Sequence, residues 1–360
     1  MNYLILMAGG HGTRLWPVSR EKEPKQIQPF IGSNETLLEQ TFKRVVKKFP
    51  LENIYITTVK NHFSEIRKLL PKIPLKNFSV EPERKDTAAA IGLVATIINK
   101  RDSESIITTI NSDHYIENKN EYIKIIQLAQ KLASEKEKYT ILVGINPNYP
   151  ETGYGYIKMK KAFKEIDDHE SFYVDRFVEK PDLKTAKTYL KRWEYLWNPA
   201  LFTWSTKNLL NLYKIHLPNI YRRLRRIQKS IGTKQEKTVI SEEYSKMDKI
   251  SIDYGILEKT KKLLVIPADF DWTDIGHWRT IKDVLSSSAK ENLIKGKHVG
   301  VGSEGNLIYS FSGRLIATAG LKNMIIIDTA DAVLICHKNS AQDVKKLVEE
   351  LKIKGFKKYL

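Results

Sequence analysis

The sequence predicts an α/β fold with a mixed, mostly parallel sheet, followed by a small C-terminal β unit and a terminal helix. Over residues 1–145, short β-branched runs alternate with amphipathic segments, as in right-handed βαβ units with helices on both faces of a sheet. From about residue 292, short apolar runs are separated by glycines. A chain of 360 residues suits one large domain and a smaller one, and we expect domains over 1–288 and 289–360.

The apolar runs before residue 150 are predicted to be sheet strands, with helices between them. Thr36 and Glu39 have the spacing of a capping box and open a helix that runs to about Phe49. Asp86 or Thr87 is expected to cap a helix of small apolar residues. The other elements predicted in this half are strands at Tyr3–Met7, Ile54–Val59, Asn77–Val80, Ser105–Ile110 and Tyr139–Ile145, and helices at Asn61–Leu70 and about Asn120–Glu137.

The remaining chain is less regular up to about residue 270. Gly153-Tyr154-Gly155 leads into a short predicted strand. Further elements are expected as strands at Phe172–Val178 and Lys262–Ile266, and as helices at Leu183–Trp193, Lys207–His216 and Ile220–Ser230. The C-terminal β unit is expected to contain strands at Val299–Gly302, Asn306–Ser310, Leu315–Ala319, Met324–Asp328 and Ala332–Cys336, and a helix over about Ser340–Lys354.

Positive charge is the main compositional bias. The formal net charge is +18, so a nucleic-acid partner has to be considered. The basic residues are spread along the chain, and their densest runs lie in segments with a helical pattern, where a solvated face is the simpler interpretation. Polyanionic small substrates would be attracted by the same field, and we expect no nucleic-acid partner.

Cysteine content and hydropathy give an expectation about location. The single cysteine, Cys336, excludes an internal disulfide framework and fits a reducing compartment. No apolar stretch reaches the roughly 18 residues that a membrane span needs. We therefore expect a cytoplasmic protein that does not insert into a membrane.

A glycine-rich loop, Ala8-Gly9-Gly10-His11-Gly12-Thr13-Arg14, follows the first predicted strand. Glycines leave backbone N–H groups accessible, and a strand that ends in such a loop is a common way to bind phosphates. A plain tight turn would explain the glycines equally well. The dinucleotide and P-loop fingerprints do not fit, because Leu15-Trp16-Pro17 follows and no Gly-Lys-Ser/Thr is present. Phosphate binding is predicted, but by a different kind of loop.

Two aspartates follow predicted strands. Asp113 follows the strand at 105–110 after Asn111-Ser112, and Asp274 lies between Trp272 and Gly276. Ligands of parallel sheets bind beyond the carboxyl ends of the strands, so Asp113 and the glycine loop are expected to share one site. Taken singly, either aspartate is explained by a turn.

Three more polar residues lie next to prolines: Lys25, Lys180 and Asn198. Taken singly, the lysines are explained by a solvated surface and the asparagine by a turn. Together with the glycine loop, Arg14 and the two aspartates, they suit a Mg²⁺ ion with phosphates, because Mg²⁺ is usually held by one or two carboxylates plus phosphate oxygens. Nucleotidyl transfer needs positioned positive charge rather than a covalent nucleophile.

These residues resemble the signature of the sugar-1-phosphate nucleotidyltransferases. Gly9-Gly10-x-Gly12-Thr13-Arg14 with Pro24-Lys25-Gln26 carries the resemblance, and Leu15-Trp16-Pro17-x-Ser19-Arg20 resembles the mannose-1-phosphate guanylyltransferase branch. Further matches follow in family order: Glu81-Pro82, Thr87-Ala88, Ser112-Asp113-His114, Pro150–Ile157, Phe177-x-Glu179-Lys180-Pro181, Trp197-Asn198, Ser251–Tyr254 and Asp271–Trp278. The ordered set is far more specific than any single motif.

The resemblance implies a Rossmann-like catalytic domain, a short β-helix-like C-terminal unit and a role for each matched position. The nucleotide phosphates would be held by Ala8, Gly9, Gly10, Gly12 and Thr13. The catalytic residues would be Arg14, Lys25, Asp113 and Asp274, the two aspartates also holding Mg²⁺. The purine would be read by Glu81, Asp86 and Thr87. The sugar phosphate would be bound by Gly153, Glu179, Lys180 and Asn198.

The expected reaction is Mg²⁺-assisted transfer of GMP from GTP to mannose 1-phosphate, giving GDP-mannose and pyrophosphate. Asp86 stands where the family usually has asparagine, and Pro199-Ala200-Leu201 replaces Ser-Gly-Met, so another nucleotide or another sugar-1-phosphate is the alternative. A non-catalytic regulator that binds nucleotide sugars is a second alternative. The small β unit and its basic helix also offer a surface for a homodimer.

Overall fold

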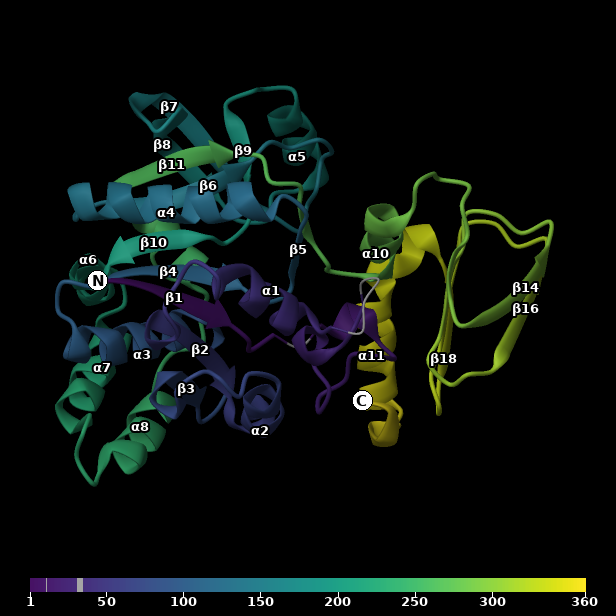
Figure 1. The fold of residues 1–360 in the computed structure, drawn as a ribbon, viewed down its shortest axis with the longest axis horizontal. Coiled ribbons are helices and arrows are strands. Elements are labelled where there is room, and N and C mark those ends of the chain that lie inside the picture. Colours follow the sequence, from purple (N-terminus) through teal and green to yellow (C-terminus); the bar gives the residue numbers. More distant parts are fainter. Residues whose placement is uncertain (11, 31–34) are drawn as a thin grey trace. The chain divides into compact units, whose positions relative to one another are not determined.

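The computed structural model describes residues 1–10, 12–30 and 35–360. The chain forms two compact units, and neither is one continuous stretch (Figure 1). Unit 1 consists of Met1–Gly9, Lys43–Asn111 and Ile116–Trp272, and unit 2 consists of Gly10–Phe42, Ser112–Tyr115 and Thr273–Leu360. The boundary expected at 288/289 divides the chain along its length rather than in space, and it stays a prediction. No helix of the described ranges is long and apolar enough to cross a membrane.

A ten-stranded sheet forms the centre of unit 1. Its strands are β1 (Asn2–Met7), β2 (Ile54–Val59), β3 (Phe78–Glu81), β4 (Ile106–Asn111), β6 (Thr140–Ile145), β7 (Gly155–Ile166), β8 (His169–Val178), β9 (Tyr195–Asn198), β10 (Phe202–Ser205) and β11 (Leu263–Ala268). They lie in the order β11-β8-β7-β9-β6-β10-β4-β1-β2-β3. β8, β9 and β10 run against the direction of the other strands. The prediction of a mixed, mostly parallel sheet is therefore confirmed.

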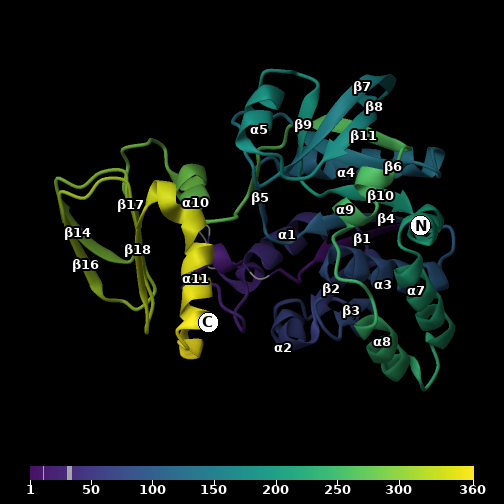
Figure 2. The same ribbon diagram turned by 180° about the vertical axis from the view of Figure 1, so that it is seen from behind.

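Helices cover both faces of this sheet, which Figures 1 and 2 show from opposite sides. They are α2 (Lys60–Leu69), α3 (Asp86–Arg101), α4 (Lys119–Glu135), α5 (Leu183–Leu190), α6 (Thr206–His216), α7 (Pro218–Ser230), α8 (Glu236–Ser245) and α9 (Ile252–Gly255). Gln130 of α4 donates a hydrogen bond to Thr108 of β4, whereas the neighbouring Ile107 packs in the core that contains α3, α6 and α7. Because adjacent strand residues point to opposite faces, α4 and α3 lie on opposite sides of the sheet.

Local sequence signals explain several helix ends. α1 (Leu37–Val45) begins with the predicted capping box: the Glu39 N–H donates to Thr36 Oγ1 at 3.1 Å, and the Thr36 N–H donates to Glu39 Oε2 at 2.9 Å. The predicted cap of α3 is wrong, because neither Asp86 nor Thr87 caps the helix with its side chain. Asp86 has a left-handed φ of 68° and accepts from the adjacent Thr87 N–H.

Four elements of unit 1 differ from the sequence-based prediction. β7 is a twelve-residue strand rather than a short one, because its long partner β8 pairs with it over most of its length. The short aromatic strands β9 and β10 were not predicted, since four residues carry too little pattern. α8 was not predicted either, because its sequence is mostly polar.

A short parallel β-helix and two helices make up most of unit 2. The elements are β13 (Leu293–Lys295), β14 (Lys297–Val301), β15 (Leu307–Ser310), β16 (Leu315–Ala319), β17 (Met324–Asp328), β18 (Val333–His337), α10 (Trp278–Leu285) and α11 (Val344–Ile353). β13, β15 and β17 pair in parallel, as do β14 and β16, and β18 closes the larger sheet in the antiparallel sense. The predicted β-helix-like unit and its terminal helix are therefore confirmed.

The N-terminal segment of unit 2 shares its apolar core with this β-helix. Leu15, Trp16 and Phe30 are buried in one cluster with residues of β15, β17, α10 and α11. Trp278 Nε1 of α10 donates to the Trp16 carbonyl at 2.9 Å. The segment around the glycine loop is therefore supported by residues far along the chain.

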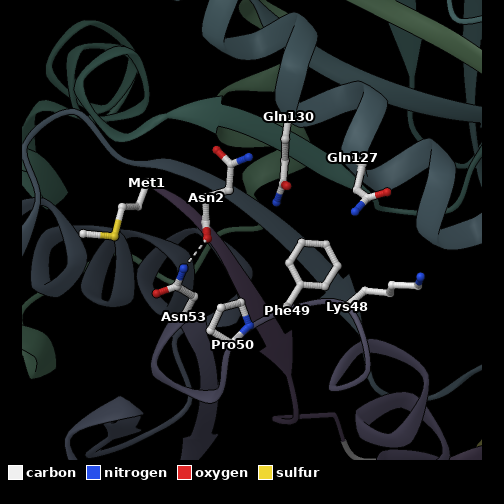
Figure 3. Close-up of a pocket in the computed structure, with 8 residues that line it drawn as sticks. All are labelled: Met1, Asn2, Lys48, Phe49, Pro50, Asn53, Gln127 and Gln130. Atoms are coloured by element: carbon white, nitrogen blue, oxygen red, sulfur yellow. Dashed lines mark hydrogen bonds between the residues drawn. The ribbon is translucent and has the colours of Figure 1, made fainter.

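A polar cavity of about 560 Å³ opens in unit 1 at the start of β1 (Figure 3). It is lined by Met1, Asn2, Lys48, Phe49, Pro50, Asn53, Gln127 and Gln130. The Asn53 side chain donates to the Asn2 carbonyl at 3.1 Å across this cavity. The cavity lies at the amino end of β1, whereas ligands of such sheets bind at the carboxyl ends, so the candidate site has to be sought at the other end of the strand.

Candidate active site

Lys25 joins the two predicted metal ligands within unit 2. Its Nζ donates to Asp113 Oδ2 at 2.9 Å and to Asp274 Oδ1 at 3.1 Å. Asp113 directly precedes β5 (His114–Ile116), and Asp274 ends β12 (Trp272–Asp274), the strand that pairs with β5. This pairing brings together two aspartates that are far apart in the sequence. Lys25 itself is only 4% exposed.

Neighbouring charges, rather than burial, decide the direction of the pKa shifts in this cluster. Burial alone would lower the pKa of Lys25, but the two carboxylates outweigh it and raise that pKa. Burial would likewise raise the pKa of Asp274, but Lys25 and the nearby His114 lower it. Lys25 is therefore cationic and Asp274 ionised at neutral pH, so the site holds a fixed charge pattern.

The carboxylate pair fits a divalent metal that relies on a substrate for its other ligands. Both carboxylates face one cation, the Lys25 ammonium. No group of three or more His, Cys, Asp or Glu side chains suited to a metal ion occurs among residues 1–10, 12–30 and 35–360. Mg²⁺ is commonly held by one or two carboxylates and phosphate oxygens rather than by a full protein cage. Asp113 and Asp274 are thus the residues that could hold such an ion.

Gly12 lies directly against the stem of Lys25. It has a left-handed φ of 64° and precedes the 3-10 turn Thr13–Leu15. A Cβ at this position would overlap the Lys25 Cβ and lie 2.9 Å from Ser19 Oγ. At Gly10, in contrast, a Cβ would have no heavy atom of another described residue within 4 Å, its chain neighbours aside. Glycine is therefore required at Gly12 by packing, while Gly10 leaves the backbone accessible to a ligand.

The start of the loop belongs to unit 1. The Ala8 N–H donates to the Thr57 carbonyl at 2.9 Å, and the Ala8 carbonyl accepts from Thr58 Oγ1 at 3.1 Å. A Cβ built on the next residue, Gly9, would lie 3.5 Å from Glu81 Oε1. His11 lies outside the described residues.

Arg14 and His277 add contrasting groups to unit 2. Arg14 is partly exposed. Burial and the positive charge of Arg14 lower the pKa of His277 to about 4, so this imidazole is neutral at physiological pH. Its Nδ1 accepts from the Thr280 N–H at the start of α10. Sequence patterns did not identify His277 as a site residue. Its distinguishing property is a lowered pKa, which depends on burial in the fold.

The residues predicted to read the purine lie around the end of β3 in unit 1. Glu81 is buried, and its carboxylate accepts from Thr57 Oγ1 at 3.3 Å and from Tyr244 Oη at 2.5 Å. Burial raises the pKa of Glu81 despite these donors. Asp86 is exposed, whereas Thr87 Oγ1 accepts from the Ile252 N–H at 2.9 Å. Tyr244 comes from α8, which the sequence pattern missed.

The residues predicted to bind the sugar phosphate form a second polar cluster of unit 1. Lys180 pairs with the Glu179 carboxylate, whose Oε2 has no hydrogen-bond partner among the described residues. Asn198 Nδ2 donates to Asp253 Oδ1 at 3.2 Å. Gly155 borders Glu179, since a Cβ on Gly155 would overlap the Glu179 carboxylate. The Gly153 N–H donates to Glu151 Oε1 at 2.7 Å, and the role of Gly153 toward a sugar stays a prediction.

Asp253 is a member of this cluster that sequence reasoning did not select as a site residue. Burial raises its pKa to about 7, with the Glu179 charge as the next cause. It lies in the matched segment Ser251–Tyr254, which was the available signal. Two carboxylates, an amide and an ammonium in one cluster can exchange several hydrogen bonds with the hydroxyls of a sugar.

Fold, glycine loop and carboxylate pair together define a nucleotidyltransferase. The chain belongs to the nucleotidyl transferase family, which matches residues 3–291. A second family, described as a MannoseP isomerase/GMP-like beta-helix domain, matches residues 296–351. The protein is therefore an enzyme of the transferase class.

Named relatives show which members of this family the chain is similar to. The chain is 34% identical over 353 residues to the mannose-1-phosphate guanylyltransferase of Salmonella muenchen, covering 97% of this chain and 73% of that protein. It is 32% identical over 358 residues to the mannose-1-phosphate guanylyltransferase of Escherichia coli strain K12, covering 98% and 74%. A crystal structure from Thermus thermophilus, described as a mannose-1-phosphate geranyltransferase, matches with a TM-score of 0.87 and 30% identity, covering 98% of this chain and 99% of the other.

Proposed function

We propose that this protein transfers GMP from GTP to α-D-mannose 1-phosphate, giving GDP-mannose and pyrophosphate. The observation that carries the proposal concerns the buried Lys25. Its ammonium donates to both Asp113 and Asp274, and its stem lies against Gly12. The near full-length similarity to mannose-1-phosphate guanylyltransferases supports the choice of substrates.

The attacking group of this reaction needs no activation by the protein. A phosphate oxygen of mannose 1-phosphate is already ionised at neutral pH, and it attacks the α-phosphorus of GTP in line with the bond to the leaving pyrophosphate. A P–O bond forms to the sugar phosphate as the bond between the α- and β-phosphates breaks. Catalysis then consists of alignment and charge stabilisation.

The residues of unit 2 supply that stabilisation in this proposal. The backbone of Gly10, Gly12 and Thr13 would bind phosphate oxygens, and Arg14 and Lys25 would offset negative charge at the reacting phosphorus. Asp113 and Asp274 would hold Mg²⁺, which when bound neutralises phosphate charge and orients the phosphates. Lys25 would exchange part of its pairing with the aspartates for contact with phosphate.

Unit 1 provides the recognition groups. Glu179, Asn198 and the backbone at Gly153 would contact sugar hydroxyls, and Lys180 would bind the sugar phosphate in place of its ion pair with Glu179. Glu81, Asp86 and Thr87 would contact the nucleoside, along with Ala8 and Gly9 of the loop.

Other parts of the proposal rest on the sequence alone. Asp86 and the Pro199–Leu201 segment depart from the family pattern, so the alternative function is the same chemistry with another nucleotide or sugar-1-phosphate. A non-catalytic regulator is the third candidate. The reducing compartment inferred from Cys336, and with it a cytoplasmic location, and the homodimer also stay predictions.

A pyrophosphate-release panel tests the proposal. The purified protein is assayed with Mg²⁺ and each of GTP, ATP, UTP and dTTP, combined with the 1-phosphates of mannose, glucose and N-acetylglucosamine. We expect the highest kcat/KM for GTP with mannose 1-phosphate, and a kcat at least about a hundredfold lower for the Asp113→Asn control. A faster reaction with another pair would establish the alternative specificity, and nucleotide binding without turnover of any pair would indicate a regulator.

A further inference from the structure

Arg20 closes a turn that ends at Glu23, two residues before Lys25. The Arg20 N–H donates to the Glu23 carbonyl at 2.9 Å, and the Glu23 N–H donates back to the Arg20 carbonyl at 3.2 Å. Arg20 Nε also donates to the Pro17 carbonyl at 2.8 Å. Arg20 therefore ties together residues 17–23, which lie between Gly12 and Lys25 in the chain.

The guanidinium of Arg20 also binds the β-helix of unit 2. Its two terminal nitrogens donate to Asp331 Oδ2 at 2.8 Å and to Asp331 Oδ1 at 2.5 Å, although the two residues are 311 positions apart. The hydrogen bond from Arg20 lowers the pKa of Asp331 to about 2. Bidentate pairing of this kind fixes orientation as well as distance, which a lysine would not do.

A turn of the β-helix positions Asp331, the residue that accepts from Arg20. Asp331 lies in the turn between β17 and β18, and Thr329 closes that turn by accepting from the Ala332 N–H at 3.2 Å and donating to Asp331 Oδ1 at 3.2 Å. The Arg20 side chain is 15% exposed and the Asp331 side chain is 33% exposed. The pair is therefore partly open to solvent, and its bidentate geometry rather than burial distinguishes it from an ordinary surface ion pair.

We propose that Arg20 and Asp331 are a positioning pair through which the β-helix holds the segment that carries Gly12 and Lys25. Among the described residues, no hydrogen bond or ion pair joins Arg20 or Asp331 to Lys25, Asp113 or Asp274, so both act through the backbone between residues 12 and 25. The inference rests on the proposed function, because it assigns the β-helix a part in aligning the phosphate-binding residues.

A double-mutant cycle with two readouts tests this pair. The variants are Asp331→Asn, Arg20→Gln and the double variant, and Glu304→Gln is the control because it breaks another ion pair of the same β-helix, that with Lys322 at 3.0 Å. We expect kcat/KM for the nucleotide to fall by about ten- to a hundredfold in each single variant, since small misplacements of positioned groups cost that much. The double variant should lose no more than the worse single variant, and Glu304→Gln should match the wild type.

The second readout is amide hydrogen exchange of residues 12–25 in the full-length protein without substrate. We expect about tenfold faster exchange in Asp331→Asn and in Arg20→Gln, with unchanged exchange in α10. Kinetics are measured with the substrate pair that the wild type turns over fastest, so the test does not depend on which sugar is the natural one. If the wild type turns over no pair, hydrogen exchange alone tests the positioning role. Unchanged exchange and kinetics in Asp331→Asn, or losses that multiply in the double variant, would overturn the positioning role.

Discussion

Replacing Gly12 by alanine tests the packing of the glycine loop against Lys25. The φ of 64° at Gly12 is costly for any residue with a Cβ, by about 1–2 kcal/mol. The new methyl group would also overlap the Lys25 Cβ, an atom of the lysine stem that cannot move without its backbone; overpacking of this kind costs about 1–3 kcal/mol. Gly12→Ala should therefore lower the free energy of unfolding by about 2–5 kcal/mol.

Gly10→Ala provides the matched control in the same loop. Apart from its chain neighbours, no heavy atom of a described residue lies within 4 Å of a Cβ at Gly10, and its φ is not in the left-handed region. Its stability should stay within about 0.5 kcal/mol of the wild type. Both variants are compared by urea unfolding followed through tryptophan fluorescence, because Trp16 and Trp278 lie in the core of unit 2. Activity is measured in parallel by pyrophosphate release.

The two variants should separate stability from ligand binding. Gly12→Ala should lose stability and activity together, because the methyl group displaces Lys25. Gly10→Ala should keep its stability and lose activity only to the extent that the methyl group blocks a phosphate. If Gly12→Ala unfolds at the same urea concentration as Gly10→Ala, Gly12 does not pack on Lys25 and the reasoning is wrong.

Further predictions concern single carboxylates. Asp113→Asn should lower kcat by at least about a hundredfold and leave the circular dichroism spectrum unchanged; near-native kcat would contradict a metal role. The pKa of Asp253 is raised to about 7, above its usual value, so ionisation costs stability progressively from about pH 4 to pH 7. Asp253→Asn should therefore stabilise the protein more at pH 8 than at pH 4 in thermal melts, and an equal effect at both pH values would refute this. Asp86→Asn should fold normally, since asparagine also tolerates a φ of 68°, and should change KM for GTP relative to ATP; an unchanged ratio would show that the departure at residue 86 is incidental.

The sheet was predictable where strands have a clear pattern of their own. β1, β2, β4 and β6 are continuous buried apolar or β-branched runs, which is typical of parallel strands covered on both faces. β9 and β10 have only four residues each, and their strand conformation depends on neighbours supplied by β6, β7 and β4. Such tertiary pairing is not visible in a local sequence window.

The site residues were predictable only where local sequence identifies them, as for the strands. Lys25, Asp113 and Asp274 were found because their motifs are local, and the structure brings these three together. Asp253 and His277 were not selected, because what distinguishes them is a pKa that burial shifts, and burial depends on the whole fold.

The discontinuous make-up of unit 2 has a consequence for recombination between relatives. A crossover near residue 289 would give the chain a foreign β-helix but keep its own Leu15, Trp16 and Phe30, which pack in the same core as β15 and β17. Core partners inherited from different parents rarely fit, because packed interiors tolerate little change in shape. Functional chimeras should therefore exchange residues 10–42, 112–115 and 273–360 together.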